Sequence, residues 1–248
     1  PGSTISGGYS NVTKGNYGSV VNGGNANSSL STSPVVGGGE GNTNFGFRAV
    51  VGGGDNNKIL PETINGFSAK SSTIGGGLQN QTYSCYNTIG GGFYNTTQSC
   101  QTAILGGGVN KILSSTLNNS SCNSVIGGGF CNTIFDSVDT FIGSGKNNFV
   151  TGCNGVIGGG QLNTIYTGSW NVIAGGASNA VCIDSGNTIG GGAANCAYSG
   201  NYSVIAGGYG NQTCTNYTGI LGGGSNIAKN PFSFIIGANI TTDRNCTT

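Results

Sequence analysis

The stretch Ile89-Gly90-Gly91-Gly92-Phe93-Tyr94-Asn95 decides the fold, because the chain repeats it from end to end. Ile126-Gly127-Gly128-Gly129-Phe130-Cys131-Asn132 is a second clear copy. The position that opens each run occurs fifteen times, at 6, 22, 37, 52, 75, 90, 106, 127, 143, 158, 174, 190, 206, 222 and 237. The steps are 15 or 16 residues, apart from one of 23 and one of 21. A fixed short period is typical of a stacked array, in which each copy forms one coil that packs on its neighbours.

An aliphatic residue precedes every opening position, which predicts a core shared by successive coils. The residue before it is often Val or Thr, and it faces another surface because adjacent strand residues point to opposite sides. A third, partly apolar column lies seven residues after the opening position, as at Ile59 and Ile134. We therefore expect two short β-strands and two turns per coil. The aliphatic column consists of Ile5, Val21, Val36, Val51, Ile74, Ile89, Leu105, Ile126, Ile142, Ile157, Ile173, Ile189, Ile205, Leu221 and Ile236.

Glycine makes up 51 of the 248 residues, and thirteen of the fifteen copies keep it at both the second and the third position of the run. Two such positions in succession cost ordering entropy, so we expect them to lie against another backbone too closely for a Cβ. An Asn follows five residues after the opening position in twelve copies. We expect this Asn to adopt the left-handed conformation and to hydrogen-bond to the same residue one coil above.

A coil of this length has room for only two or three inward aliphatic side chains, so the core of a single chain is thin. Association of several chains would bury a second face, and the Val/Thr column is available for it. The sequence therefore predicts a homo-oligomer.

Two further copies, Cys122-Asn123-Ser124-Val125-Ile126-Gly127 and Gly200-Asn201-Tyr202-Ser203-Val204-Ile205-Ala206-Gly207-Gly208, carry a family resemblance. They resemble the head repeats of trimeric autotransporter adhesins, and more closely the Gly-Gly-Gly/Asn repeats in fibre proteins of phages and large algal viruses. The resemblance implies an all-β fold: a left-handed parallel β-roll, or β-solenoid, of about 15 coils, assembled as a homotrimeric rod that attaches to a surface. The 15–16 period, the full glycine triplets and the cysteines depart from the adhesin pattern and favour the viral fibre group.

The period also sets the expected boundaries. Residues 1–3 are interpreted as a tag remnant, 4–240 as one elongated repeat domain, and 241–248 as a tail. Insertions near 58–70 and 111–121 lengthen two coils, and extra residues in such an array emerge as loops, often on the binding face.

Composition argues against several classes of function. Only 6% of residues are charged and the net charge is +1, which gives no basis for binding nucleic acid. No run of 18 apolar residues exists, so we expect no membrane insertion. Histidine is absent, which removes Ser-His-Asp catalysis and His-containing metal sites. We expect no enzyme, no catalytic residue, no metal site and no cofactor. Glu40 and Asp55, at equivalent positions of adjacent coils, are interpreted as solvated turn acids, with a glycosidase pair or a Ca²⁺ site as the alternative.

Aromatic residues at repeated positions are the candidate ligand contacts, because rings on a rigid surface can stack on sugars or anchor a protein. Packing over the turns, or between chains, is the alternative. Four residues before the opening position lie Tyr86, Trp170 and Tyr202, and just after the glycines lie Tyr9, Phe93, Phe130 and Tyr209.

Six of the nine cysteines fall into two groups that we expect to stack on neighbouring coils. Stacked coils place Cα atoms within the range that a disulfide needs, and free thiols in a reducing compartment are the alternative. The groups are Cys85, Cys100 and Cys122, and Cys182, Cys196 and Cys214.

These observations together predict a structural fibre or adhesin segment on a virion or cell surface. Its expected partners are itself, as a homotrimer, and a host glycan or receptor. A purely architectural shaft, an ice-binding solenoid with a flat Thr array, and a polysaccharide-cleaving solenoid are the alternatives.

Overall fold

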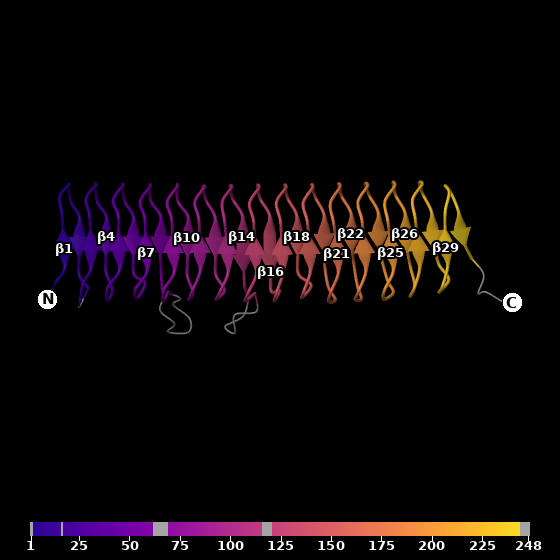
Figure 1. Cartoon of the computed structure of the whole chain (residues 1–248), viewed down its shortest axis with the longest axis horizontal. Helices are drawn as coiled ribbons and strands as arrows, with labels where there is room; N and C mark the ends of the chain where they lie inside the picture. The colour runs from indigo at the N-terminus through magenta and orange to yellow at the C-terminus, as the bar shows by residue number, and fades with distance from the viewer. Residues whose placement is uncertain (1, 16, 62–68, 116–120, 244–248) are drawn as a thin grey trace. The chain divides into compact units, whose positions relative to one another are not determined.

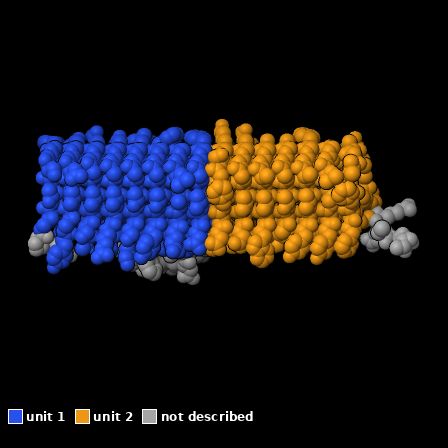
Figure 2. Space-filling model, in the orientation of Figure 1, with its two compact units in different colours: residues 1–131 blue, residues 132–248 orange. Residues whose placement is uncertain are grey.

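The computed structural model describes residues 2–15, 17–61, 69–115 and 121–243. Every element in these residues is a β-strand of two or three residues, and no helix occurs among them (Figure 1). The chain divides into two compact units, Pro1–Cys131 and Asn132–Thr248 (Figure 2). Most of the 58–70 insertion and part of the 111–121 insertion fall outside the described residues, as do Pro1 and the end of the expected tail.

In the first unit the odd-numbered strands pair in parallel in the order β1 to β15, and the even-numbered strands in the order β2 to β14. The odd strands are β1 Thr4–Ile5, β3 Val20–Val21, β5 Val35–Val36, β7 Val50–Val51, β9 Thr73–Ile74, β11 Thr88–Ile89, β13 Ala103–Ile104 and β15 Val125–Ile126. The even strands are β2 Val12–Thr13, β4 Ser28–Ser29, β6 Thr43–Asn44, β8 Lys58–Ile59, β10 Gln81–Thr82, β12 Thr96–Thr97 and β14 Lys111–Leu113.

The second unit repeats this arrangement, with β17 to β29 in one parallel ladder and β16 to β30 in the other. Its odd strands are β17 Phe141–Ile142, β19 Val156–Ile157, β21 Val172–Ile173, β23 Thr188–Ile189, β25 Val204–Ile205, β27 Gly219–Ile220 and β29 Phe234–Ile235. Its even strands are β16 Thr133–Phe135, β18 Phe149–Val150, β20 Thr164–Ile165, β22 Ala180–Val181, β24 Cys196–Ala197, β26 Gln212–Thr213, β28 Ile227–Ala228 and β30 Thr241–Thr242. The β-solenoid expected from the sequence is confirmed, with one odd and one even strand in each coil.

The core of each unit lies between its two ladders. The second residue of a strand points inward and pairs with its equivalent one coil on, as Ile89 does with Ile104 and Thr82 with Thr97. The inward residues of the odd strands are fully buried from Val21 to Ile220. Those of the even strands are buried from Ser29 to Ala228 but include polar residues such as Asn44 and Thr82. The core is therefore one aliphatic column and one mixed column, as the sequence predicts.

Three residues of the expected aliphatic column do not lie in the core. Leu105, Leu221 and Ile236 are 60%, 51% and 67% exposed, and the buried positions belong to Ile104, Ile220 and Ile235. In these coils a second aliphatic residue stands between the buried one and the glycine run, so alignment on the residue before the run shifts the register by one. Ile5 is 45% exposed, and its strand β1 pairs only with β3 in the described ladder.

The three residues after each odd strand form a turn, and we name them the first, second and third turn positions. The third is glycine in fourteen coils, from Gly8 to Gly223, with φ between 79° and 101°. A Cβ on Gly92 would overlap the carbonyl oxygen of Gly107 one coil on, and the other coils follow the same pattern. This glycine is required both by its backbone conformation and by the approach of the next coil.

The repeated Asn forms a buried ladder through each unit. Asn95 donates from Nδ2 to the carbonyl oxygens of Gly91 and Gly107, both at 3.0 Å, and its Oδ1 accepts the Asn110 N–H at 3.0 Å. The expected bond between successive Asn residues is confirmed. The expected left-handed conformation is wrong for the Asn, because the residue before it takes positive φ, as Tyr94 does at 55°.

Candidate functional site

The seven aromatic candidates all lie on the surface, at two corners of the coil, and Tyr9, which follows Gly8, is 76% exposed. Tyr86, Trp170 and Tyr202 occupy a corner with φ of 57–58° and are 51–64% exposed. The other corner, just after the third turn position, carries Phe93, Phe130 and Tyr209, which are 41–66% exposed. Contact of these rings with a ligand stays a prediction.

The structure brings together only some of these rings. Phe93 and Phe130 lie with ring centroids 6.3 Å apart. Tyr202 stacks on Tyr217 at 5.8 Å with an interplanar angle of 11°, and Tyr217 stacks on Phe232 at 5.3 Å and 6°. Successive coils therefore build a continuous pile of three exposed rings in the second unit.

Tyr217 and Phe232 were missed because of the register shift in their coils. Counted from the true first turn positions, Leu221 and Ile236, both lie four residues upstream, the same offset that identifies Tyr202. The signal was present in the sequence, and alignment on the first glycine concealed it.

This pile of rings forms one wall of an apolar groove of about 440 Å³. We call it the aromatic groove. Val204, Gly219 and Phe234 line it from the odd strands, and Leu221 adds the neighbouring turn. Among the odd strands that the structure describes, Gly219 is the only glycine at the first residue. A neutral, apolar surface of this kind suits a side chain or an uncharged ligand.

The acidic candidates lie far from this groove in the sequence, in the first unit. Glu40 and Asp55 are bridge partners on adjacent coils, as expected. Each accepts a hydrogen bond from an Asn side chain: Asn25 Nδ2 lies 3.2 Å from Glu40 Oε1, and Asn56 Nδ2 lies 2.6 Å from Asp55 Oδ1. Within the described ranges no group of three or more His, Cys, Asp or Glu residues is placed to hold a metal ion.

The cysteines of the first group occupy one corner position. Gln101 donates its N–H to the Cys85 carbonyl at 3.0 Å, which sets Cys85 and Cys100 on adjacent coils. The Cys100 Sγ lies 2.9 Å from Ser84 Oγ. Burial raises the pKa of the Cys85 thiol.

The second group does not form a straight column. Cys196 opens β24, whereas Cys182 and Cys214 each follow an even strand, so Cys196 is two residues out of line. The Cys182 and Cys196 Sγ atoms are still 3.5 Å apart, as thiols. Burial, followed by the hydrogen bond with Cys182, raises the pKa of Cys196 to about 12, and burial also raises the pKa of Cys214.

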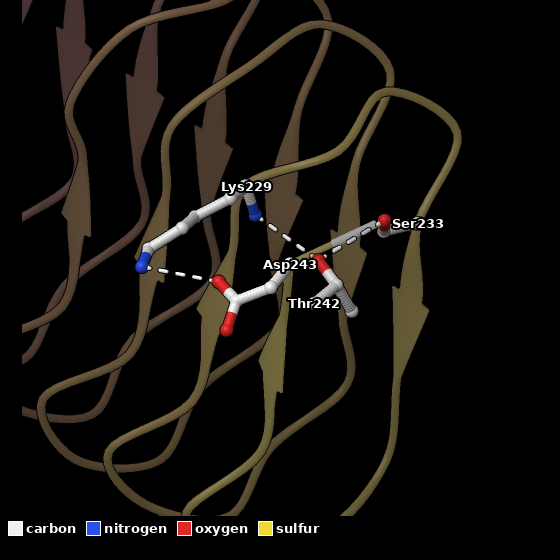
Figure 3. A network of polar contacts seen from close by, with 4 residues as sticks. All are labelled: Lys229, Ser233, Thr242 and Asp243. Atoms are coloured by element: carbon white, nitrogen blue, oxygen red, sulfur yellow. Dashed lines mark hydrogen bonds and ion pairs between the residues drawn. The ribbon is translucent and has the colours of Figure 1, made fainter. Parts of the chain in front are cut away.

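The last described coil carries a small polar network (Figure 3). Lys229 Nζ and Asp243 Oδ1 form an ion pair at 3.2 Å, the Lys229 N–H donates to Thr242 Oγ1 at 3.1 Å, and Ser233 Oγ lies 3.3 Å from the same hydroxyl. The paired side chains are 52% and 65% exposed, so the ion pair contributes little to stability. The network fixes β30 to the coil before it.

No helix long and apolar enough to cross a membrane is present in the described part of the chain. Comparison of the sequence with protein-family models and with curated proteins finds no match.

Proposed function

We propose that this chain is a segment of a surface fibre, a stiff homotrimeric spacer on a virion or cell surface that attaches to a host glycan or receptor. The observation that carries the proposal is the second turn position, which is glycine in almost every coil. At seven of these glycines φ lies outside the left-handed region and a Cβ would meet no atom within 4 Å. The seven are Gly91, Gly106, Gly128, Gly175, Gly191, Gly207 and Gly222.

Nothing within the described part of a single chain requires glycine at these seven positions. Glycine in extended structure costs roughly 0.5–1 kcal/mol relative to alanine. A glycine kept without a local reason indicates that another backbone approaches from outside the chain. Sister chains that pack along the turns supply that backbone.

The thin core supports the same conclusion. Each coil after the first buries one aliphatic residue from its odd strand, and the even strand often adds only a polar one, such as Asn44, Thr82 or Thr97. Association would bury apolar surface that one chain leaves exposed.

Attachment is the role that best suits the exposed aromatic corners. Three identical chains would present each weak contact three times, which raises the overall affinity without any new contact. A glycan array on the intact protein separates attachment from a purely architectural shaft: reproducible binding supports attachment, and an empty array with a trimeric protein favours the shaft.

Sedimentation equilibrium of the wild type and two variants tests the assembly. We expect the wild type to have three times the mass of one chain. Gly191→Val should keep the β-sheet circular dichroism signal and lose mass, because the added side chain fits the lone coil but meets the partner. Asn25→Ala, on another exposed corner, is the control and should remain a trimer. A monomeric wild type, or a fully trimeric Gly191→Val variant, would overturn the proposal.

A further inference from the structure

Three cysteines of the first unit occupy the same position in consecutive coils. Each stands three residues before the first residue of an odd strand and is followed by a residue with φ of 56–58°. The odd strands concerned, β11, β13 and β15, pair in register, first residue with first residue. The cysteines therefore lie one above another at one corner of the solenoid. They are Cys85, Cys100 and Cys122.

The spacing of the coils suits a disulfide at this corner. Neighbouring strands of a sheet lie about 4.8 Å apart. The Gln101 N–H donates to the Cys85 carbonyl at 3.0 Å, so the coils are bonded at the corner as well as in the strands. Cysteines in register on adjacent coils therefore have Cα atoms about 4.8 Å apart, within the range of about 4.4–6.8 Å that a disulfide needs.

The Cys100 sulfur is directed towards the coil that carries Cys85. Its Sγ lies 2.9 Å from the Oγ of Ser84, the residue immediately before Cys85. Burial is the main cause of the raised pKa of Cys85, and a hydrogen bond with the Cys100 side chain adds to it. The two thiols are therefore in contact, which favours Cys85 as the partner of Cys100.

The thiol pair of the second unit is less suited to a disulfide, although its sulfur atoms are only 3.5 Å apart. Cys196 pairs in register with Ala180, which stands two residues before Cys182. Two residues span about 6.6 Å along a strand, so the Cα atoms of Cys182 and Cys196 are about 8 Å apart. A bridge over more than about 7 Å needs movement of the backbone. The short distance between these sulfurs comes from side chains that reach diagonally across the sheet.

We propose that Cys85 and Cys100 are a site of oxidation by low-molecular-weight disulfides, at which a bond forms between adjacent coils of the first unit, while Cys182 and Cys196 remain thiols. The bond lies within one chain, so the proposal is independent of assembly and attachment.

Oxidised glutathione serves as the oxidant of this class. The thiolate of one cysteine attacks a glutathione sulfur, which forms a mixed disulfide and releases one glutathione thiolate. The thiolate of the other cysteine then attacks the protein sulfur of the mixed disulfide and releases the second glutathione. The two protein thiols lose two protons and two electrons, and the glutathione disulfide takes up both as two thiols.

The bond closes a loop of one coil and joins that coil to the next covalently. Closure of such a loop restricts the unfolded chain, which stabilises the folded state. The melting temperature of the bridged protein should therefore exceed that of the reduced protein by at least about 3 °C.

Peptide mapping without reduction tests the site. The full chain is incubated with a mixture of reduced and oxidised glutathione, the remaining thiols are alkylated, and the protein is cut with trypsin and chymotrypsin. Chymotrypsin cuts after Phe93 and Tyr94, between the two cysteines, so we expect two peptides joined through Cys85 and Cys100. Electrophoresis without reductant should show single chains.

Two serine variants complete the test, with circular dichroism to check that each is folded. Cys100→Ser should lose both the bridge and the difference in melting temperature. Cys182→Ser, the matched change in the second unit, should keep both. A bridge between Cys182 and Cys196 while Cys85 and Cys100 stay reduced would overturn the proposal. So would a link from Cys100 to Cys122, links between chains, glutathione adducts that never resolve into a bridge, or a bridged protein with an unchanged melting temperature.

Discussion

At the scale of single residues, the three turn positions show that one glycine run has more than one cause. The third position is fixed by positive φ and by the carbonyl of the next coil, as at Gly192 with φ of 79°. The second position, one residue earlier at Gly191, has neither constraint. The first position admits larger side chains in some coils, including Leu105 and Ala174.

Gly192→Ala should therefore lower the free energy of unfolding by at least about 2 kcal/mol, through backbone strain and overlap with the next coil. The neighbouring Gly191→Ala should change it by no more than about 1 kcal/mol. Thermal unfolding followed by circular dichroism, at concentrations where the chain is dissociated, measures both. Equal losses in the two variants would show that the two positions do not differ in the way described.

The buried hydroxyl of Thr97 offers a second test at this scale. Its Oγ1 has no hydrogen-bond partner among the described residues, and burial of such a group is unfavourable. Thr97→Val should raise the free energy of unfolding by about 1 kcal/mol. Thr96→Val, on the outward side of the same strand, is the control and should stay within about 0.5 kcal/mol. A destabilised Thr97→Val variant would mean that the hydroxyl is satisfied in solution.

At the scale of strands and turns, the Asn ladder connects each coil to the next. Asn95→Ala would leave two glycine carbonyls and the Asn110 N–H without their side-chain partner. We expect a loss of about 2–4 kcal/mol in the free energy of unfolding. Asn25→Ala, whose side chain makes only an exposed bond to Glu40, should cost less than about 0.5 kcal/mol. Chemical denaturation of both variants distinguishes a structural ladder from a row of replaceable turn residues.

The thiol contact between β22 and β24 predicts a dependence on pH. Cys196 has a pKa of about 12 in the folded chain against an ordinary value of 9.0, because burial disfavours the thiolate. The folded state therefore binds the proton more tightly than the unfolded state, and the stabilisation is complete below pH 9. It should be lost progressively as the pH rises from 9 towards 12. A Cys196→Ala variant should show a shallower fall in melting temperature over that window, and identical slopes would rule out this residue as the cause.

The strands and the core could be predicted from the sequence because an aliphatic column with a fixed period indicates a core that successive coils share. The corners could not. Several coils hold residues with positive φ whose types are not those associated with it, such as Val109 at 58° and Trp170 at 58°. Left-handed backbone costs such residues about 1–2 kcal/mol each. Hydrogen bonds to the previous coil offset the cost, as the Val109 N–H does to the Phe93 carbonyl at 2.9 Å. Because those bonds depend on stacking, no local sequence signal marks the corners.

The register of three coils could not be predicted from the glycine run alone either. Leu-Gly-Gly-Gly and Ile-Gly-Gly-Gly look equivalent, although Leu105 lies outside the core and Ile89 inside it. The Asn spacing separates them, since Asn110 lies six residues after the buried Ile104 just as Asn95 does after Ile89. The same correction recovers Tyr217, because Asn226 lies six residues after Ile220, but it does not recover Phe232, because Thr241 stands six residues after Ile235.

At the scale of the whole molecule, the proposed assembly depends on apolar packing and backbone approach. Because the first residues of the odd strands and the first turn positions carry no charge in the described coils, association along the turns should respond little to ionic strength. We expect the association constant to change less than about threefold between 50 and 500 mM NaCl. An interface that depends on charged side chains would instead lose more than about tenfold in its association constant over this range. Sedimentation velocity over this range measures the change, and a steep salt dependence would place charged side chains in the contact.

Pairing between nearest neighbours only has a consequence for how such a protein can change. The strands of one coil bond to the coil before and the coil after, as β11 does to β9 and β13, and no strand pairing in the described ladders skips a coil. Duplication or deletion of one copy in the gene, by unequal crossing-over between similar repeats, would alter the number of coils and leave every remaining junction intact. The length of the solenoid can then change by whole coils while the residues that would contact a ligand stay the same.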